Sequence, residues 1–328
     1  MIRSLYFTAD GQLQTDLSQE EISLALQDLK GVLWVDFEAN PVEMDEKLLT
    51  SVFGFHPLAV DDALQETHVP KVDDWATYLY IVLSAVMVEK NNDSLLEVLE
   101  LDVFLGKHYM VTHHDQPIAA VQRVWDACQR DDRHLRRGVD HVLYRLVDEV
   151  VAQYMPVVEE IDDEIDRIED EIFNNPGPDL LARIFSLKRT VLQMRRIIGP
   201  QREVLNRLAR DDYEVIDTLT RVYFRDVYDH LVRLHDLTES LRDLIGGALD
   251  TYLSVINNRM NDIMKTLTVI TTLFMPISFV VGFFGMNYFF PVAQTDQWTD
   301  LPSFIITLSI LVLLPAGMLA WIRRRGWM

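Results

Sequence analysis

Small, polar and thioether side chains recur every three or four positions in the segment before Gly285. They are Asn261, Met264, Thr268, Thr271, Met275, Ser278 and Gly282. On a helix this spacing places all of them on one face, here called the polar stripe, while Leu273, Phe274 and Phe279 lie on the other faces. Such a face could pack closely against a neighbouring helix. Alternatively, its hydroxyl and amide groups could contact hydrated ions between narrow methionine rings. The spacing alone leaves both interpretations open.

Two uncharged segments would have to position this stripe. Residues 266–295 and 301–322 contain no charged side chain, over 30 and 22 positions. Because about 20 apolar residues span a bilayer as a helix, both segments are long enough; the other interpretation is two buried helices of a soluble core. We predict a two-span membrane protein with no buried acids for a proton relay. Two helices cannot enclose a water path, so any pore requires several copies of the chain.

Basic residues flank the predicted spans on one side. Arg259 and Lys265 precede the first span and 323–325 are arginines after the second, whereas the connecting segment 287–301 has no Lys or Arg. By the positive-inside rule we expect both termini in the cytoplasm. We expect the membrane to be a bacterial-type inner (plasma) membrane. Residues 1–14 lack the apolar region of a signal peptide. Trp298, Trp321 and Trp327 stand where aromatic belts are expected.

The composition limits the partners and the chemistry. The chain has 328 residues, enough for two domains, and a net charge of −21 that argues against nucleic acid and is compatible with binding cations. Its single cysteine, Cys128, excludes an internal disulfide and suits a reducing compartment. No G-x-x-x-x-G-K-[ST], H-E-x-x-H or G-x-S-x-G motif of an enzyme is present. His113 and His114 are adjacent in a predicted strand, so they face opposite sides and chelate poorly together. A cation sensor without a pore remains a further hypothesis.

The N-terminal part reads as mixed α/β. Alternating apolar and β-branched residues predict a hairpin around Asp10 and Gly11 and further strands, at 31–39, 77–89, 95–106 and 108–114. Segments 45–54 and 56–66 are typical of helices. From about residue 117 the pattern is helical throughout.

Charge separates two of the later helices. The acid-rich segment 159–172 has an isoleucine stripe, and a basic helix follows the turn sequence NNPGPD. These features favour an antiparallel acid–base helix hairpin, or an acidic face that only contacts solvent. Residues 201–275 contain no proline, so after a break near Asp211 one helix is predicted from about Glu214 to Phe284.

The predicted parts follow one another along the chain. They are a cytoplasmic α/β domain (1–125), a helical region with the acid–base hairpin (126–212), a stalk helix continuing into the first span (213–286), an outer loop (287–302), the second span (303–322) and a basic cytoplasmic tail (323–328).

Several segments resemble a known family in the order in which they occur. The helix 261–284 followed by Gly-Met-Asn, the two C-terminal spans, the RRRGW tail and the segments 53–75, 159–172 and 223–268 resemble the CorA family of divalent-cation channels. The resemblance covers nearly the whole chain. It implies a homopentamer with a cytoplasmic α/β funnel, a stalk helix that lines the pore and an outer ring of second helices in the membrane lipid.

The resemblance assigns roles to individual residues. The signature Gly285, Met286 and Asn287 would form the selectivity filter. Mg²⁺ dehydrates reluctantly, and the waters of its shell would donate hydrogen bonds to five Asn287 amide oxygens. The pore lining would comprise Asn261, Met264, Leu267, Thr268, Thr271, Met275 and Ser278. This set largely coincides with the polar stripe, so the resemblance favours the pore interpretation.

Four acids correspond to regulatory cation sites between subunits. Asp62 would face Asp226, with Asp61 and Asp148 at a second site. Facing carboxylates repel unless a cation lies between them, so bound Mg²⁺ would hold the channel closed. The resemblance thus implies Mg²⁺, Co²⁺ or Ni²⁺ influx controlled by internal Mg²⁺, without an organic cofactor. The alternative is a Zn²⁺, Co²⁺ or Ni²⁺ transporter, with or without coupling to protons.

The chain departs from the family pattern outside the tripeptide. The outer loop NYFFPVAQTDQW lacks the glutamate of many members, leaving Asp296 and Asp300 as its acids, and Phe284 stands where tyrosine is common. We expect weaker attraction of cations to the mouth. Met286 favours the Mg²⁺ branch over the zinc-transporting branch.

Overall fold

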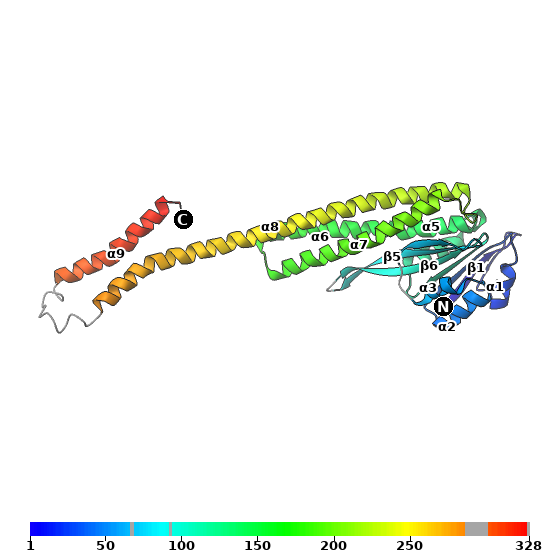
Figure 1. Ribbon diagram of the computed structural model, residues 1–328, viewed down its shortest axis with the longest axis horizontal. Helices are drawn as coiled ribbons and strands as arrows, with labels where there is room; N and C mark the ends of the chain where they lie inside the picture. The colour runs from blue at the N-terminus through cyan, green and yellow to red at the C-terminus, as the bar shows by residue number, and fades with distance from the viewer. Residues whose placement is uncertain (66–68, 92–93, 286–300, 327–328) are drawn as a thin grey trace. The chain divides into compact units, whose positions relative to one another are not determined.

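The computed structural model describes residues 1–65, 69–91, 94–285 and 301–326. The chain forms two compact units, Met1–Asp250 and Thr251–Met328, and Figure 1 colours it from the N-terminus to the C-terminus. A mixed α/β part comes first, long helices follow, and two apolar helices end the chain. This is the predicted fold class.

Seven strands make one sheet in the first unit. Their bounds are β1 (Ile2–Phe7), β2 (Leu13–Thr15), β3 (Val32–Glu38), β4 (Lys71–Asp74), β5 (Leu79–Asn91), β6 (Ser94–Leu105) and β7 (Tyr109–His114). The spatial order is β2-β1-β3-β7-β6-β5-β4. The predicted hairpin around Gly11 is present, with β1 and β2 antiparallel. Among the described pairs only β3 and β7 are parallel, so their carboxyl ends meet at one edge.

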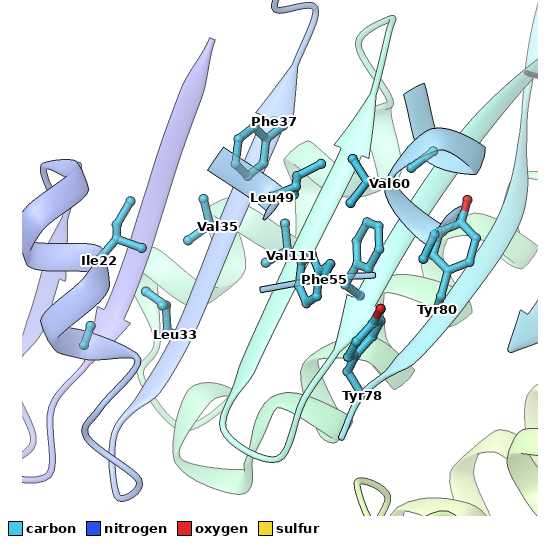
Figure 2. Packing of buried hydrophobic residues seen from close by; sticks show 14 of the residues in the cluster. Ile22, Leu33, Val35, Phe37, Leu49, Phe55, Val60, Tyr78, Tyr80 and Val111 are labelled. Carbon is cyan, nitrogen blue, oxygen red and sulfur yellow. The ribbon is translucent and has the colours of Figure 1, made fainter. Parts of the chain in front are cut away.

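One face of the sheet is covered by three short helices. They are α1 (Gln19–Ala25), α2 (Val42–Ser51) and α3 (Pro57–Gln65). Alternate residues of β3, such as Val35 and Phe37, pack with Leu49, Phe55 and Val60 in this layer, as Figure 2 shows. Full burial of each such side chain contributes about 1.5–3 kcal/mol, so the alternation fixes which face of β3 meets the helices.

The other face is covered by longer helices. They are α4 (Ala119–Arg130), α5 (Val139–Ala152), α6 (Tyr154–Asn174) and α7 (Pro178–Arg210), with a short 3₁₀ turn η1 (Leu135–Arg137) after α4. Trp34 of β3 contacts Trp125 of α4 edge-on at 4.8 Å between ring centroids. The sheet is therefore enclosed between two helical layers.

The acid–base hairpin is confirmed in α6 and α7. Arg183 of α7 donates from Nη2 to Glu164 Oε1 at 2.7 Å and also pairs with Glu171. Ile161 and Ile165 are buried beneath this charged layer. Glu164 and Glu171 of α6 thus have a basic partner on α7.

A single helix, α8 (Thr218–Phe284), follows the break that was predicted near Asp211 and that occupies residues 211–217. It begins at Thr218 rather than near Glu214, ends at Phe284 as predicted, and contains Pro276. The second unit holds its C-terminal part and α9 (Leu301–Arg324). The apolar windows of α8 and α9 have mean hydropathies of 1.9 and 2.3 and are only 6% buried.

Candidate functional site

The polar stripe lies on an uncovered face of α8. Its described members and Leu267 are all exposed within one chain, and Met264 and Met275 are 57% and 67% exposed. Thr268 Oγ1 donates to the Met264 carbonyl oxygen at 2.8 Å, so its remaining lone pairs face outward as acceptors. Acceptors suit the hydrogen atoms of a hydrated cation.

The signature tripeptide begins at the end of α8. The Gly285 N–H donates to the Val281 carbonyl at 2.9 Å, and a Cβ at this position would lie 3.0 Å from the same oxygen. A glycine therefore fits here more easily than any larger residue. Met286 and Asn287, and the loop residues Asp296 and Trp298, lie outside the described residues.

Two of the predicted regulatory acids lie on α3. Asp61 is exposed, whereas Asp62 pairs with Lys71 of β4. Both positions belong to the helical layer on the β3 face that carries Phe37.

The other two acids lie close together on the opposite side of the sheet. Asp148 of α5 is 3.6 Å from Arg145, and Asp226 of α8 is exposed. Burial raises the pKa of Asp148, and the negative charges of Glu149 and Asp226 raise it further. Arg145 and His230 act in the opposite direction, but the net shift is upward. Within one chain the sheet lies between this pair and the two α3 acids. If carboxylates of α3 and α8 face each other, they therefore come from different chains.

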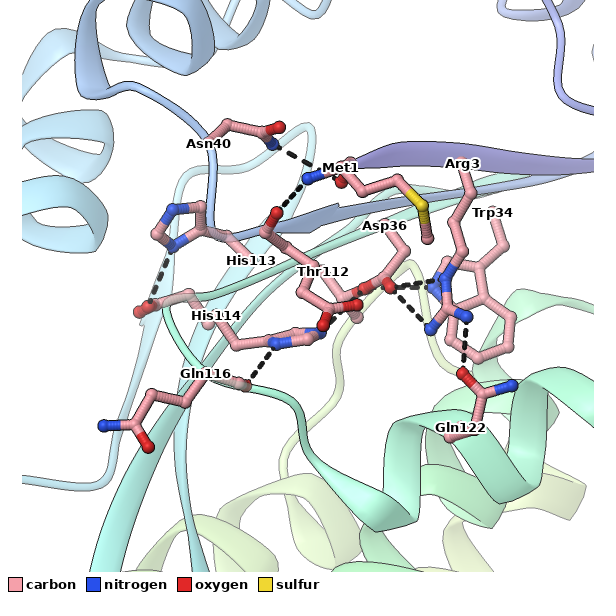
Figure 3. A network of polar contacts seen from close by, with 12 residues as sticks. Met1, Arg3, Trp34, Asp36, Asn40, Thr112, His113, His114, Gln116 and Gln122 are labelled. Carbon is pink, nitrogen blue, oxygen red and sulfur yellow. Dashed lines mark hydrogen bonds and ion pairs between the residues drawn. The ribbon is translucent and has the colours of Figure 1, made fainter.

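Sequence reasoning missed a buried polar network on β3 and β7. Asp36 Oδ2 accepts from Arg3 Nε at 2.8 Å, and Asp36 Oδ1 accepts from the Thr112 hydroxyl, which in turn accepts from Trp34 Nε1. His114 Nε2 lies 3.3 Å from Asp36 Oδ1, as Figure 3 shows. Burial would raise the pKa of Asp36, but His114, Thr112 and Arg3 outweigh it, so the pKa is lowered.

His113 faces the other side of β7, as the strand period predicts. Its Nε2 lies 3.6 Å from Asp45 and its Nδ1 3.7 Å from Asp102. Burial lowers the pKa of His113, but the two carboxylates outweigh burial and raise it. The adjacent histidines therefore belong to separate clusters. The alternation of apolar and polar residues in VDFE and VTHH is the sequence signal from which these clusters could have been predicted.

The chain is similar in sequence and in fold to known metal ion transporters. A family model described as CorA-like Mg²⁺ transporter protein matches residues 30–324. The cobalt/magnesium transport protein CorA of Thermotoga maritima is 34% identical over 281 residues, which cover 84% of this chain and 78% of that protein. The protein of the same name from Methanocaldococcus jannaschii is 24% identical over the full length of both chains. The complete structure of the CorA magnesium transporter from that organism superimposes with a TM-score of 0.83 at 22% identity, over 100% of this chain and 99% of that one.

Proposed function

Because the chain belongs to the family of CorA-like Mg²⁺ transporter proteins, we propose that it is a passive channel for hydrated Mg²⁺ that also admits Co²⁺. It is a divalent metal ion transporter with two C-terminal transmembrane helices, and not an enzyme. The single observation that supports a channel is the polar stripe of α8, which is left exposed by all the residues that the structure describes.

Five copies would surround the path, each contributing one α8 stripe. Asn287 amides at the outer end would hydrogen-bond the water shell of Mg²⁺, and Met264 and Met275 would form apolar constrictions further in. With residues 1–212 and both termini in the cytoplasm and 287–302 outside the plasma membrane, an inside-negative potential drives entry. A doubly charged ion gains about 4.6 kcal/mol per 100 mV.

Internal Mg²⁺ would close this channel. In the proposal Asp61 and Asp62 of one subunit approach Asp148 and Asp226 of the next, and a cation between them offsets their repulsion. Burial is the main cause of the raised pKa of Asp148, and the charges of Glu149 and Asp226 add to it; a bound cation would offset both effects. Loss of Mg²⁺ would loosen the subunit contacts and open the constrictions.

The test is cation uptake into proteoliposomes that contain a Mg²⁺-sensitive dye. We expect voltage-driven Mg²⁺ entry in the parent, loss of most of it in Asn287→Ala, and retention in Gln294→Ala, which removes another amide from the same loop. Entry of Zn²⁺ or Ni²⁺ without Mg²⁺ would favour the transporter alternative, and a loss of uptake when a pH gradient is collapsed would favour proton coupling. No flux of any cation would contradict a channel.

A separate measurement addresses the gate. Asp226→Lys places a fixed cation at the proposed intersubunit site, so the cytoplasmic part should resist protease in EDTA as the parent does in Mg²⁺. Asp236→Lys, which changes another exposed acid of α8, is the matched control. Equal cleavage of Asp226→Lys and the parent in EDTA would contradict the regulatory role.

A further inference from the structure

A carboxylate pair and an imidazole meet at the carboxyl ends of β3 and β7. The parallel register places Asp36 opposite Thr112 and Glu38 opposite His114, so these four side chains share one face of the sheet. One oxygen or nitrogen atom from each of Asp36, Glu38 and His114 lies within 4.8 Å of the other two. Asp36 and His114 are buried and Glu38 is half-buried.

The contacts of His114 fix which of its nitrogens carries hydrogen. Nδ1 lies 2.7 Å from the Gln116 carbonyl oxygen, and because a carbonyl only accepts, Nδ1 must donate. Nε2 has no hydrogen-bond partner although the residue is only 2% exposed. It points at Asp36 Oδ1 (Figure 3). Two lone pairs that face each other repel, so the space between them requires either a proton or a cation.

The distance between these atoms fits two ligands of one metal ion. His114 Nε2 and Asp36 Oδ1 are 3.3 Å apart. Two ligand atoms each about 2.0–2.1 Å from a tetrahedral Zn²⁺ are about 3.3 Å apart. The spacing therefore matches two ligands of one small divalent ion.

The surroundings supply what a metal site needs. The Gln116 carbonyl orients His114 through its second nitrogen, and Arg3 and Thr112 fix the Asp36 carboxylate; such supporting contacts are typical of metal ligands. Glu38 is half-buried and can move inward as a third ligand.

We propose that Asp36, Glu38 and His114 bind a divalent transition-metal ion of the Zn²⁺, Co²⁺ and Ni²⁺ class. The donor set of one imidazole nitrogen and two carboxylate oxygens suits these ions, whereas Mg²⁺ demands octahedral oxygen coordination. The site is distinct from the all-carboxylate regulatory sites and from the pore. It does not depend on the proposed transport.

The test is equilibrium dialysis of the full-length protein, stripped with EDTA in detergent, against Zn²⁺ in a large excess of Mg²⁺. Mg²⁺ occupies the oxygen-only sites, so Zn²⁺ retained per chain reports sites with nitrogen. We expect the parent to retain a single additional Zn²⁺ per chain relative to His114→Gln and Glu38→Gln. His108→Gln, which removes an imidazole at the other end of β7, should bind like the parent. Equal Zn²⁺ in the parent and both site variants would overturn the proposal, as would loss in His114→Gln alone.

A second readout separates binding from misfolding. Glu38→Gln preserves the shape of a half-buried side chain and leaves the Arg3–Asp36 pair intact, so this variant keeps the test valid if His114→Gln does not fold. Because a ligand that binds only the folded state stabilises it, Zn²⁺ should raise the unfolding temperature of the parent and not that of Glu38→Gln. An equal rise in both would contradict the site.

Discussion

The two parts of α8 differ in what covers them. From Thr220 to Tyr252 a residue is buried every three or four positions, and Phe224, Val227 and Leu231 are completely buried. After Tyr252, Val269 is the one buried residue among those whose burial the structure describes in this helix. The later part is nevertheless the more apolar, and its Ile270, Phe274 and Phe279 side chains are 49%, 61% and 71% exposed.

This contrast shows which part of the helix is completed by its own chain. The first part packs its apolar stripe against the first unit, as an amphipathic helix of a soluble domain does. The second part leaves a continuous apolar surface larger than an isolated soluble chain tolerates. Membrane lipid is a partner that such a surface requires, and in the proposed channel other copies of the chain would cover the rest of it.

The largest predicted effect compares two phenylalanines of α8. Phe224→Ala should lower the free energy of unfolding by about 3–5 kcal/mol, because it leaves a cavity in a packed core; Phe224 is 0% exposed and Phe274 is 61% exposed. Phe274→Ala should change it by about 0.5 kcal/mol or less. Denaturant unfolding of the detergent-solubilised protein, followed by circular dichroism, measures both. Equal losses would abolish the distinction between the two parts.

A second prediction concerns acid sensitivity of the first part. Buried His141 of α5 lies 5.9 Å from the Tyr223 ring of α8. Burial, with the charges of Arg137 and His134, lowers its pKa to about 4. In the folded state His141 therefore stays neutral, whereas in the unfolded chain it binds a proton below its ordinary pKa of about 6.5. The free energy of unfolding consequently falls as the pH drops from about 6.5 to about 4. The fall is at most about 1.4 kcal/mol per pH unit.

Unfolding between pH 7 and pH 5 tests this origin. His141→Gln should lose less stability on acidification than the parent, and His230→Gln, which replaces an exposed histidine of α8, should lose as much as the parent. Parallel curves for the parent and His141→Gln would assign the acid sensitivity to other groups.

The smallest predicted effect lies near the junction of the two parts. Gly246 is an exposed helical residue, and a Cβ there would meet nothing within 4 Å. Gly246→Ala should stabilise α8 by about 0.5–1 kcal/mol, because alanine loses less conformational freedom on folding. The denaturant midpoint measures the gain. A loss of stability would show that another chain packs closely against Gly246.

The sequence predicted the elements whose patterns are local. Strand alternation identified β3, β5, β6 and β7, and the uncharged segments identified both membrane helices. It missed β4, a short edge strand rich in charge, and α1, although Ser18 and Glu21 form a capping box that marks its start.

The candidate sites were less predictable because they depend on pairing between distant segments. The polar stripe is a property of one helix, so its spacing was visible. Asp36 and His114 are 78 positions apart, and only the parallel register of β3 and β7 brings them together. For the same reason the separation of Asp61 from Asp226 by the sheet could not be read from spacing.

Pro276 gives one turn of α8 a different chemistry from the rest. Its ring has no N–H to donate to the carbonyl oxygen of Thr272. In hydrocarbon an unsatisfied carbonyl costs several kcal/mol, so this turn is stable only where water or a neighbouring donor reaches it. Water or a donor from a neighbouring helix is therefore required beside Met275, midway along the apolar segment, and the helix can bend at this turn without breaking a further hydrogen bond.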